Sequence, residues 1–151
     1  MTMSRDEVVD YIERLGFMKY SVSDVGSNTN ETYIFDENLE IVLEKKVDYY
    51  TSWYGNHPIT YKVLFRWFRS NLKTFTLDSI TPFDICDVTA RMMEVYHNNI
   101  KSGNVMYMDR VLKFERANNE LLKVIRRDLK IHLVLLSEIE AERKEDTNGV
   151  K

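Results

Sequence analysis

Cysteine is almost missing from this chain of 151 residues, with Cys86 as its single copy. One cysteine cannot form a disulfide within the chain, which excludes the small disulfide-stapled folds of secreted proteins. No window approaches the roughly 18 uninterrupted apolar residues of a membrane span. Residues 1–16 carry acids where a signal peptide would have an apolar core. We therefore expect a cytoplasmic protein that makes no membrane contact.

Catalytic and cofactor motifs are equally scarce. The chain has no glycine-rich phosphate loop, no nucleophile elbow and no Cys-x-x-Cys pair. Cys86 stands between Asp84 and Asp87, and acidic neighbours disfavour the thiolate that a nucleophile requires. Glu94 and His97 have the Glu-x-x-His spacing of di-iron bundles, but the other histidines do not repeat it. The sequence thus predicts no enzyme, no cofactor and no metal site.

The chain does have the composition of one globular domain and a charge that is segregated along it. Hydrophobic residues make up 44% and charged residues 30% of the sequence. Residues 1–58 hold 5 basic and 11 acidic side chains, whereas residues 59–151 hold 16 basic and 13 acidic ones. This segregation matters more for surface recognition than the net charge of −3.

The N-terminal part predicts a helix followed by three strands. Ser4 and Glu7 form a capping-box pattern, and Gly16 is typical of the residue that ends a helix. Alternating apolar residues predict strands near residues 18–22, 32–35 and 39–43. We expect an antiparallel three-stranded meander packed on the first helix.

The remainder predicts helices. Pro58 suits the first position of a helix that runs to residue 73, before a short strand at 74–77. Thr81 and Pro82 begin a helix that runs to about residue 100, and nothing stops a helix from 105 to 145. The expected fold is therefore a single α+β domain. It comprises an α-β-β-β-α part at 1–73, a helical part at 81–145 and a flexible tail at 146–151.

A basic strip marks the predicted helix at 58–73. Winding it at 100° per residue brings four basic side chains within a strip about 40° wide. These are Lys62, Arg66, Arg69 and Lys73. The strip is either the solvated edge of a buried helix or a contact for phosphates or an acidic protein surface.

The predicted order of helix, three strands and helix across residues 4–73 is similar to the double-stranded-RNA-binding domain in topology alone. That family carries a lysine-rich signature at the start of its second helix. This chain has His57-Pro58-Ile59-Thr60-Tyr61-Lys62 in the corresponding place. The resemblance therefore concerns the order of elements and does not extend to the RNA-binding signature.

The last predicted helix carries a packing seam with 3-4-3-4-3 spacing. Its members are Leu122, Ile125, Leu129, His132, Leu136 and Ile139. Val111, Phe114, Asn118 and Leu121 extend it backward with a slip in phase, and polar residues in such a seam fix its register. The seam packs either on the helix at 82–100 of the same chain or on a second chain, in a homodimer.

These observations favour a small non-enzymatic interaction module, a regulator or assembly factor that contacts a protein partner through helices. The alternative is a nucleic-acid-binding regulator that uses the basic strip together with Arg126, Arg127 and Lys130. The richness in Tyr, Asn, Lys, Asp and Met is typical of an AT-rich source such as a phage.

Overall fold

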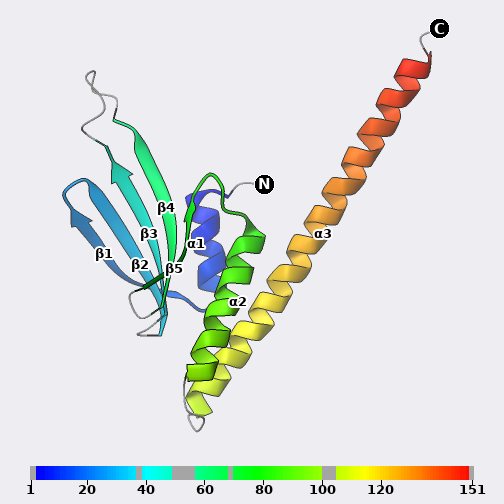
Figure 1. Ribbon diagram of the computed structural model, residues 1–151. Helices are drawn as coiled ribbons and strands as arrows, with labels where there is room; N and C mark the ends of the chain where they lie inside the picture. The colour runs from blue at the N-terminus through cyan, green and yellow to red at the C-terminus, as the bar shows by residue number, and fades with distance from the viewer. Residues whose placement is uncertain (1–2, 37–38, 49–56, 68–69, 100–104, 150–151) are drawn as a thin grey trace.

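The computed structural model describes residues 3–36, 39–48, 57–67, 70–99 and 105–149. Within them the chain forms one helix, one antiparallel sheet and two further helices, so the expected α+β class is confirmed (Figure 1). The elements are α1 (Arg5–Arg14), β1 (Met18–Val25), β2 (Asn28–Asp36), β3 (Leu39–Val47), β4 (Ile59–Trp67), β5 (Ser70–Thr76), α2 (Pro82–Asn99) and α3 (Val105–Gly149).

Helix α1 begins and ends where its local signals predict. The Ser4 hydroxyl accepts from the Glu7 amide at 3.2 Å, and the Ser4 amide donates to the Glu7 carboxylate at 3.3 Å. Two orphan amides of the first turn are thereby satisfied. After the helix, Gly16 adopts a φ of 101°, which glycine tolerates far better than other residues. This turn directs the chain into β1.

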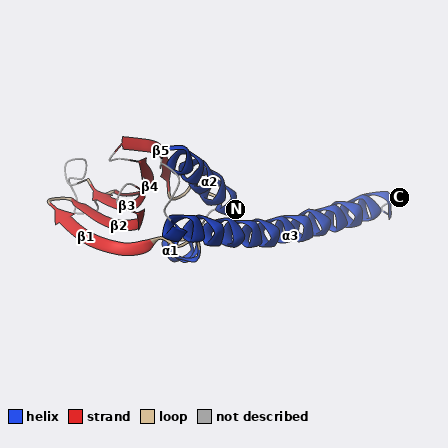
Figure 2. Ribbon diagram, turned by 90° about the horizontal axis from the view of Figure 1, so that it is seen from below, coloured by secondary structure: helices blue, strands red, loops and turns tan. Residues whose placement is uncertain are grey.

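The sheet is a simple meander with the strand order β1-β2-β3-β4-β5, and every neighbouring pair is antiparallel. Its first three strands are the predicted meander. Helices α1 and α2 lie on one face of the sheet (Figures 1 and 2). The core between them contains Tyr33, Ile41 and Phe65 from the strands, Ile12 from α1 and Ile85 from α2.

The predicted helix at 58–73 is wrong. Residues 59–67 form strand β4, which pairs along its whole length with β3, and residues 70–76 form the edge strand β5. Residues 74–76 of the short strand predicted at 74–77 belong to this longer β5, which ends at Thr76. The sheet therefore has five strands where a three-stranded meander was expected. The similarity in topology to the double-stranded-RNA-binding domain is lost.

The alternation of buried and partly exposed side chains explains why residues 59–67 form a strand instead of a helix. Val63 and Phe65 are buried against the helices, whereas Lys62, Leu64 and Arg66 alternate with them on the other face and are partly exposed. The β-branched and aromatic residues of this stretch favour strands, and β3 offers a complete ladder of hydrogen-bond partners. Pairing with β3 outweighs the local helical pattern.

Helices α2 and α3 confirm the C-terminal prediction. The Thr81 hydroxyl accepts from the Asp84 amide at 3.2 Å and caps α2. Helix α3 is continuous over 45 residues, a length of about 68 Å at 1.5 Å per residue. It reaches Gly149 and thus includes most of the segment expected as a tail. Figure 1 shows α3 running beside α2 and then far past the rest of the molecule.

Candidate interaction surface

The first half of α3 is held against the domain by an apolar seam. Val111, Phe114, Leu121 and Ile125 are buried at 3-4 spacing, together with Asn118, and α3 packs on α2 over this stretch. The Phe114 ring lies edge-on to Phe35 of β2, with 6.2 Å between the ring centroids. This part of the predicted seam packs within the chain.

One side chain that the sequence analysis did not single out also anchors α3. Arg110 donates a hydrogen bond to the backbone carbonyl of Phe35, and its guanidinium lies 4.8 Å from the centroid of the Phe35 ring. A lone arginine near the start of a helix carries no sequence signal for such a contact. Together with Phe114 it fixes the base of α3 to the end of β2.

Beyond Ile125 the helix leaves the domain. We call residues 126–149 of α3 the projecting segment. Every described side chain of this segment, at 126–131 and 133–144, is exposed. Ile125 is 7% exposed, whereas Leu129 is 47% and Leu133 57% exposed. The apolar side chains exposed there are Leu129, Ile131, Leu133, Val134, Leu135, Leu136 and Ile139.

The apolar side chains of the projecting segment surround the helix. Residues 133–136 are four consecutive apolar residues, and at 100° per residue they cover its whole circumference. A helix that is apolar all round is normally buried. Soluble proteins rarely leave a large contiguous apolar patch uncovered. The four consecutive apolar residues at 133–136 are visible in the sequence, and the predicted seam includes only Leu136 of them.

The predicted self-association residues divide between two environments. Ile125 is buried and Leu122 is partly buried against the core, whereas Leu129, Leu136 and Ile139 are exposed. His132 lies in the helix, but its side chain is outside the described part of the structure. The seam was expected to pack either within the chain or on a second chain, and its two halves differ in this respect. The half before residue 126 packs within the chain and the half after it is uncovered.

The predicted basic strip is not a helical strip, because its described members Lys62, Arg66 and Lys73 lie on strands. Lys62 and Arg66 lie on the sheet face away from the helices, opposite Glu44 and Glu40 of β3. The Arg66 guanidinium is 4.0 Å from the Glu40 carboxylate. Acidic neighbours therefore offset the positive charge that this face would present to phosphates.

The other predicted basic residues lie elsewhere. Lys73 pairs in register with Phe65 and lies on the helix-facing side of β5, with its ammonium 5.7 Å from the centroid of the Phe75 ring. Arg69 lies outside the described residues. Arg126, Arg127 and Lys130 are exposed at the start of the projecting segment. The described members of the two predicted patches therefore do not share one surface.

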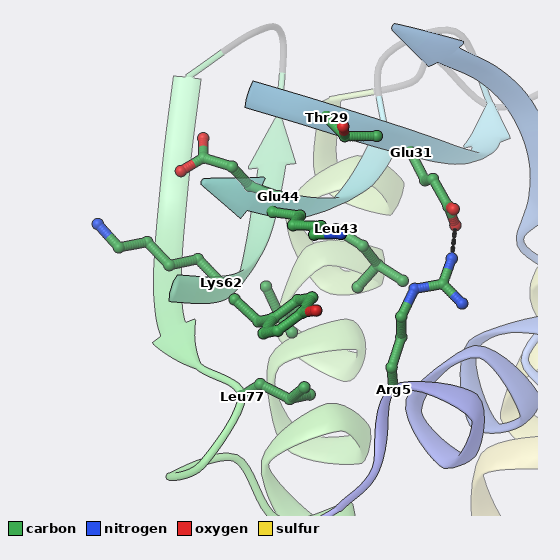
Figure 3. A pocket seen from close by; sticks show the side chains of 10 residues that line it. Arg5, Thr29, Glu31, Leu43, Glu44, Lys62 and Leu77 are labelled. Carbon is green, nitrogen blue, oxygen red and sulfur yellow. Dashed lines mark hydrogen bonds and ion pairs between the residues drawn. The ribbon is translucent and has the colours of Figure 1, made fainter. Parts of the chain in front are cut away.

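A small cavity opens beside the start of α1, as Figure 3 shows. Arg5 of α1 forms an ion pair with Glu31 of β2, and the Tyr33 hydroxyl donates to the same carboxylate at 3.3 Å. Burial, and then the Glu31 carboxylate, raise the pKa of Tyr33 above its usual value. The cavity measures about 60 Å³, far below the roughly 300–1,000 Å³ of ligand pockets. We interpret this pair as a link between α1 and β2.

The groove between α2 and α3 is larger, at about 560 Å³, and Glu94, His97 and Asn118 line it among apolar side chains. Glu94 and His97 have the spacing of a metal-binding pair. Within the described residues, however, no group of three or more His, Cys, Asp or Glu side chains could hold a metal ion.

Cys86 lies on the buried side of α2 and is a free thiol. Burial raises its pKa to about 11. The thiolate is the reactive form of cysteine, so this environment makes Cys86 a poor nucleophile. Cys86 belongs to the hydrophobic core of the domain.

Comparison of the chain with protein-family models, with curated proteins and with solved structures found no match. Among the described residues, no helix has an apolar stretch long enough to cross a bilayer. Of the features described, the exposed apolar side chains of the projecting segment are the strongest indication of a binding surface.

Proposed function

We propose that this protein is a non-enzymatic interaction module, a regulator or assembly factor, that binds a protein partner through the projecting segment of α3. The observation that carries the proposal is the run of exposed apolar side chains from Leu129 to Ile139 on a helix that leaves its own domain. Apolar helix faces of this kind associate with other helices or with apolar grooves. The folded domain would serve to hold and present the helix.

We also propose that the protein is located in the cytoplasm, and the buried free thiol of Cys86 supports this location. Unpaired cysteines suit a reducing compartment, so we assign the protein to the cytoplasm.

A matched pair of variants tests the proposal. Leu136→Asp places a charge on the exposed apolar run, whereas Ser137→Asp adds the same charge at the next exposed position. We expect Leu136→Asp to reduce the binding of partner protein, in co-precipitation or cross-linking, by at least about tenfold, since a buried unpaired charge is costly. Ser137→Asp should bind within a few-fold of the parent chain. Equal binding by both variants would mean that the contact lies elsewhere.

The nucleic-acid alternative rests on the exposed Arg126, Arg127 and Lys130. If these residues meet phosphates, a gel shift with the parent chain at low salt should weaken steeply as salt is added. Replacing all three by Gln should flatten that dependence. Absence of any shift at low salt would remove the alternative.

A further inference from the structure

Two blocks of opposite charge flank the apolar middle of the projecting helix. Residues 123–130 hold four basic side chains and one acidic side chain, a net charge of +3. Residues 138–146 hold five acidic side chains and two basic ones, a net charge of −3. We call these the basic block and the acidic block. Residues 131–136, which are apolar except for His132, lie between them.

Neither block can neutralise the other within one helix. Side chains on a helix reach only three or four residues along it, whereas Arg126 and Glu138 are about 18 Å apart along the axis. Within each block, moreover, exposed like charges stand at i,i+4 spacing, as Arg126 with Lys130 and Glu138 with Glu142. Such pairs destabilise an isolated helix. A partner with the opposite order of charges would relieve this repulsion.

We infer that the occupant of the projecting segment is a second copy of this chain, aligned antiparallel with its midpoint near residue 134. This inference rests on the proposed function and names its partner. The alignment overlaps the two apolar runs. It also sets Arg126 level with Glu142 of the second copy, and Lys130 level with Glu138 of the second copy. Each basic block then lies beside an acidic block.

The parallel alignment has the opposite electrostatics. It sets basic block beside basic block and acidic block beside acidic block, at the separation of roughly 8–10 Å typical of packed helices. That separation is within about one Debye length at physiological salt, so the blocks still interact across it. Exposed ion pairs are individually weak. The apolar side chains therefore supply the affinity, and the charge blocks decide the orientation.

Spin labels on the full chain test the orientation. Thiols introduced by Ser137→Cys and, separately, by Lys144→Cys are exposed, whereas Cys86 is buried and slow to react. In the antiparallel pair, like-numbered labels should be offset along the axis by about 9 Å at position 137 and about 30 Å at position 144. Equal short distances at both positions would show a parallel pair and overturn the inference.

Charge reversal provides a second test with its own control. Converting Arg126, Arg127 and Lys130 to Glu should weaken self-association by about tenfold or more, because two acidic blocks then face each other. Mixing this variant with a chain in which Glu138, Glu140 and Glu142 are Lys should restore association in a mixed pair. In a parallel pair the reversed block would still face its own copy, so affinity would not change. That result would contradict the antiparallel alignment.

Failure of this inference is distinguishable from failure of the proposed function. A mass of 18.0 kDa by light scattering up to about 100 μM would exclude the second copy. The Leu136→Asp and Ser137→Asp comparison would still report whether a different protein binds the same residues. A mass of two or more copies, with the label distances above, is the result that we expect.

Discussion

Asn118 is the polar side chain in the packing seam of α3, at 8% exposure, and its side-chain oxygen has no hydrogen-bond partner. A buried acceptor without a partner costs about 1–3 kcal/mol, so the residue weakens the contact between α2 and α3. Such a residue is tolerated where it restricts the register of two helices.

Asn118→Leu should therefore raise the free energy of unfolding by about 1 kcal/mol, measured by urea denaturation. Asn119→Leu is the matched control, since Asn119 is exposed and its replacement should leave stability nearly unchanged. A loss of stability in Asn118→Leu would mean that the polar group is needed where it is.

Cys86 predicts how stability responds to alkaline pH. Burial raises its pKa in the folded protein to about 11, from an ordinary value of 9.0. The contribution of the Cys86 thiol to the free energy of unfolding is complete below pH 9. It is lost as the pH rises toward 11, because the thiol of the unfolded chain deprotonates first. The loss should reach about 2–3 kcal/mol by pH 11.

Cys86→Ala should remove this part of the alkaline slope, in urea melts at several values between pH 8 and pH 11. Some slope should remain, because burial also raises the pKa values of Tyr11 and Tyr33. Parallel pH profiles for the parent chain and Cys86→Ala would contradict the account of this thiol.

At the scale of elements, the turn between α1 and β1 depends on Gly16. A Cβ at this position would lie 3.2 Å from a ring carbon of Phe35, and the φ of 101° strains any other residue. Gly16→Ala should cost about 2–3 kcal/mol, measured by denaturant melts.

Gly26→Ala helps to separate the cost of a positive φ from the cost of the contact with Phe35. Gly26 also has a positive φ, of 61°, but a Cβ added to it would meet no atom within 4 Å. Its replacement should cost only about 1 kcal/mol. Equal losses at both positions would mean that the contact with Phe35 adds nothing.

Elements with local signals were predictable from the sequence, and β4 was not. The caps at Ser4 and Thr81 act within one turn, so the starts of α1 and α2 could be read directly. Residues 59–67 satisfy both periods, since Lys62 and Arg66 share a face in a helix and also in a strand. The choice depends on pairing with β3, which is remote in the sequence.

The candidate surface was also predictable only in part, because the sequence shows the apolar spacing along α3 but not its tertiary contacts. The seam spacing predicted that α3 packs on another helix, and the structure buries Ile125 in this way but leaves Leu129, Leu136 and Ile139 exposed. Which of them pack within the chain depends on how far α2 extends along α3. That is a property of the tertiary structure, and it places the boundary after Ile125.

At the scale of the whole molecule, a globular domain holds one end of a helix about 68 Å long. A compact chain of 151 residues would have a radius of gyration near 15 Å, so the helix extends well past the domain. Most of the stability of helices in proteins comes from tertiary packing of their apolar side chains, and the described side chains of the projecting segment make no such contact within the chain. The projecting segment should therefore be stable chiefly when something covers it.

Amide hydrogen exchange of the full chain tests this claim most directly. Residues 111–125 pack on the domain and should exchange slowly at every protein concentration. Residues 126–144 should exchange almost as slowly at high concentration and should lose that protection on dilution, as the second copy dissociates. Fast exchange of residues 126–144 at all concentrations, and also with a candidate protein partner added, would contradict the account.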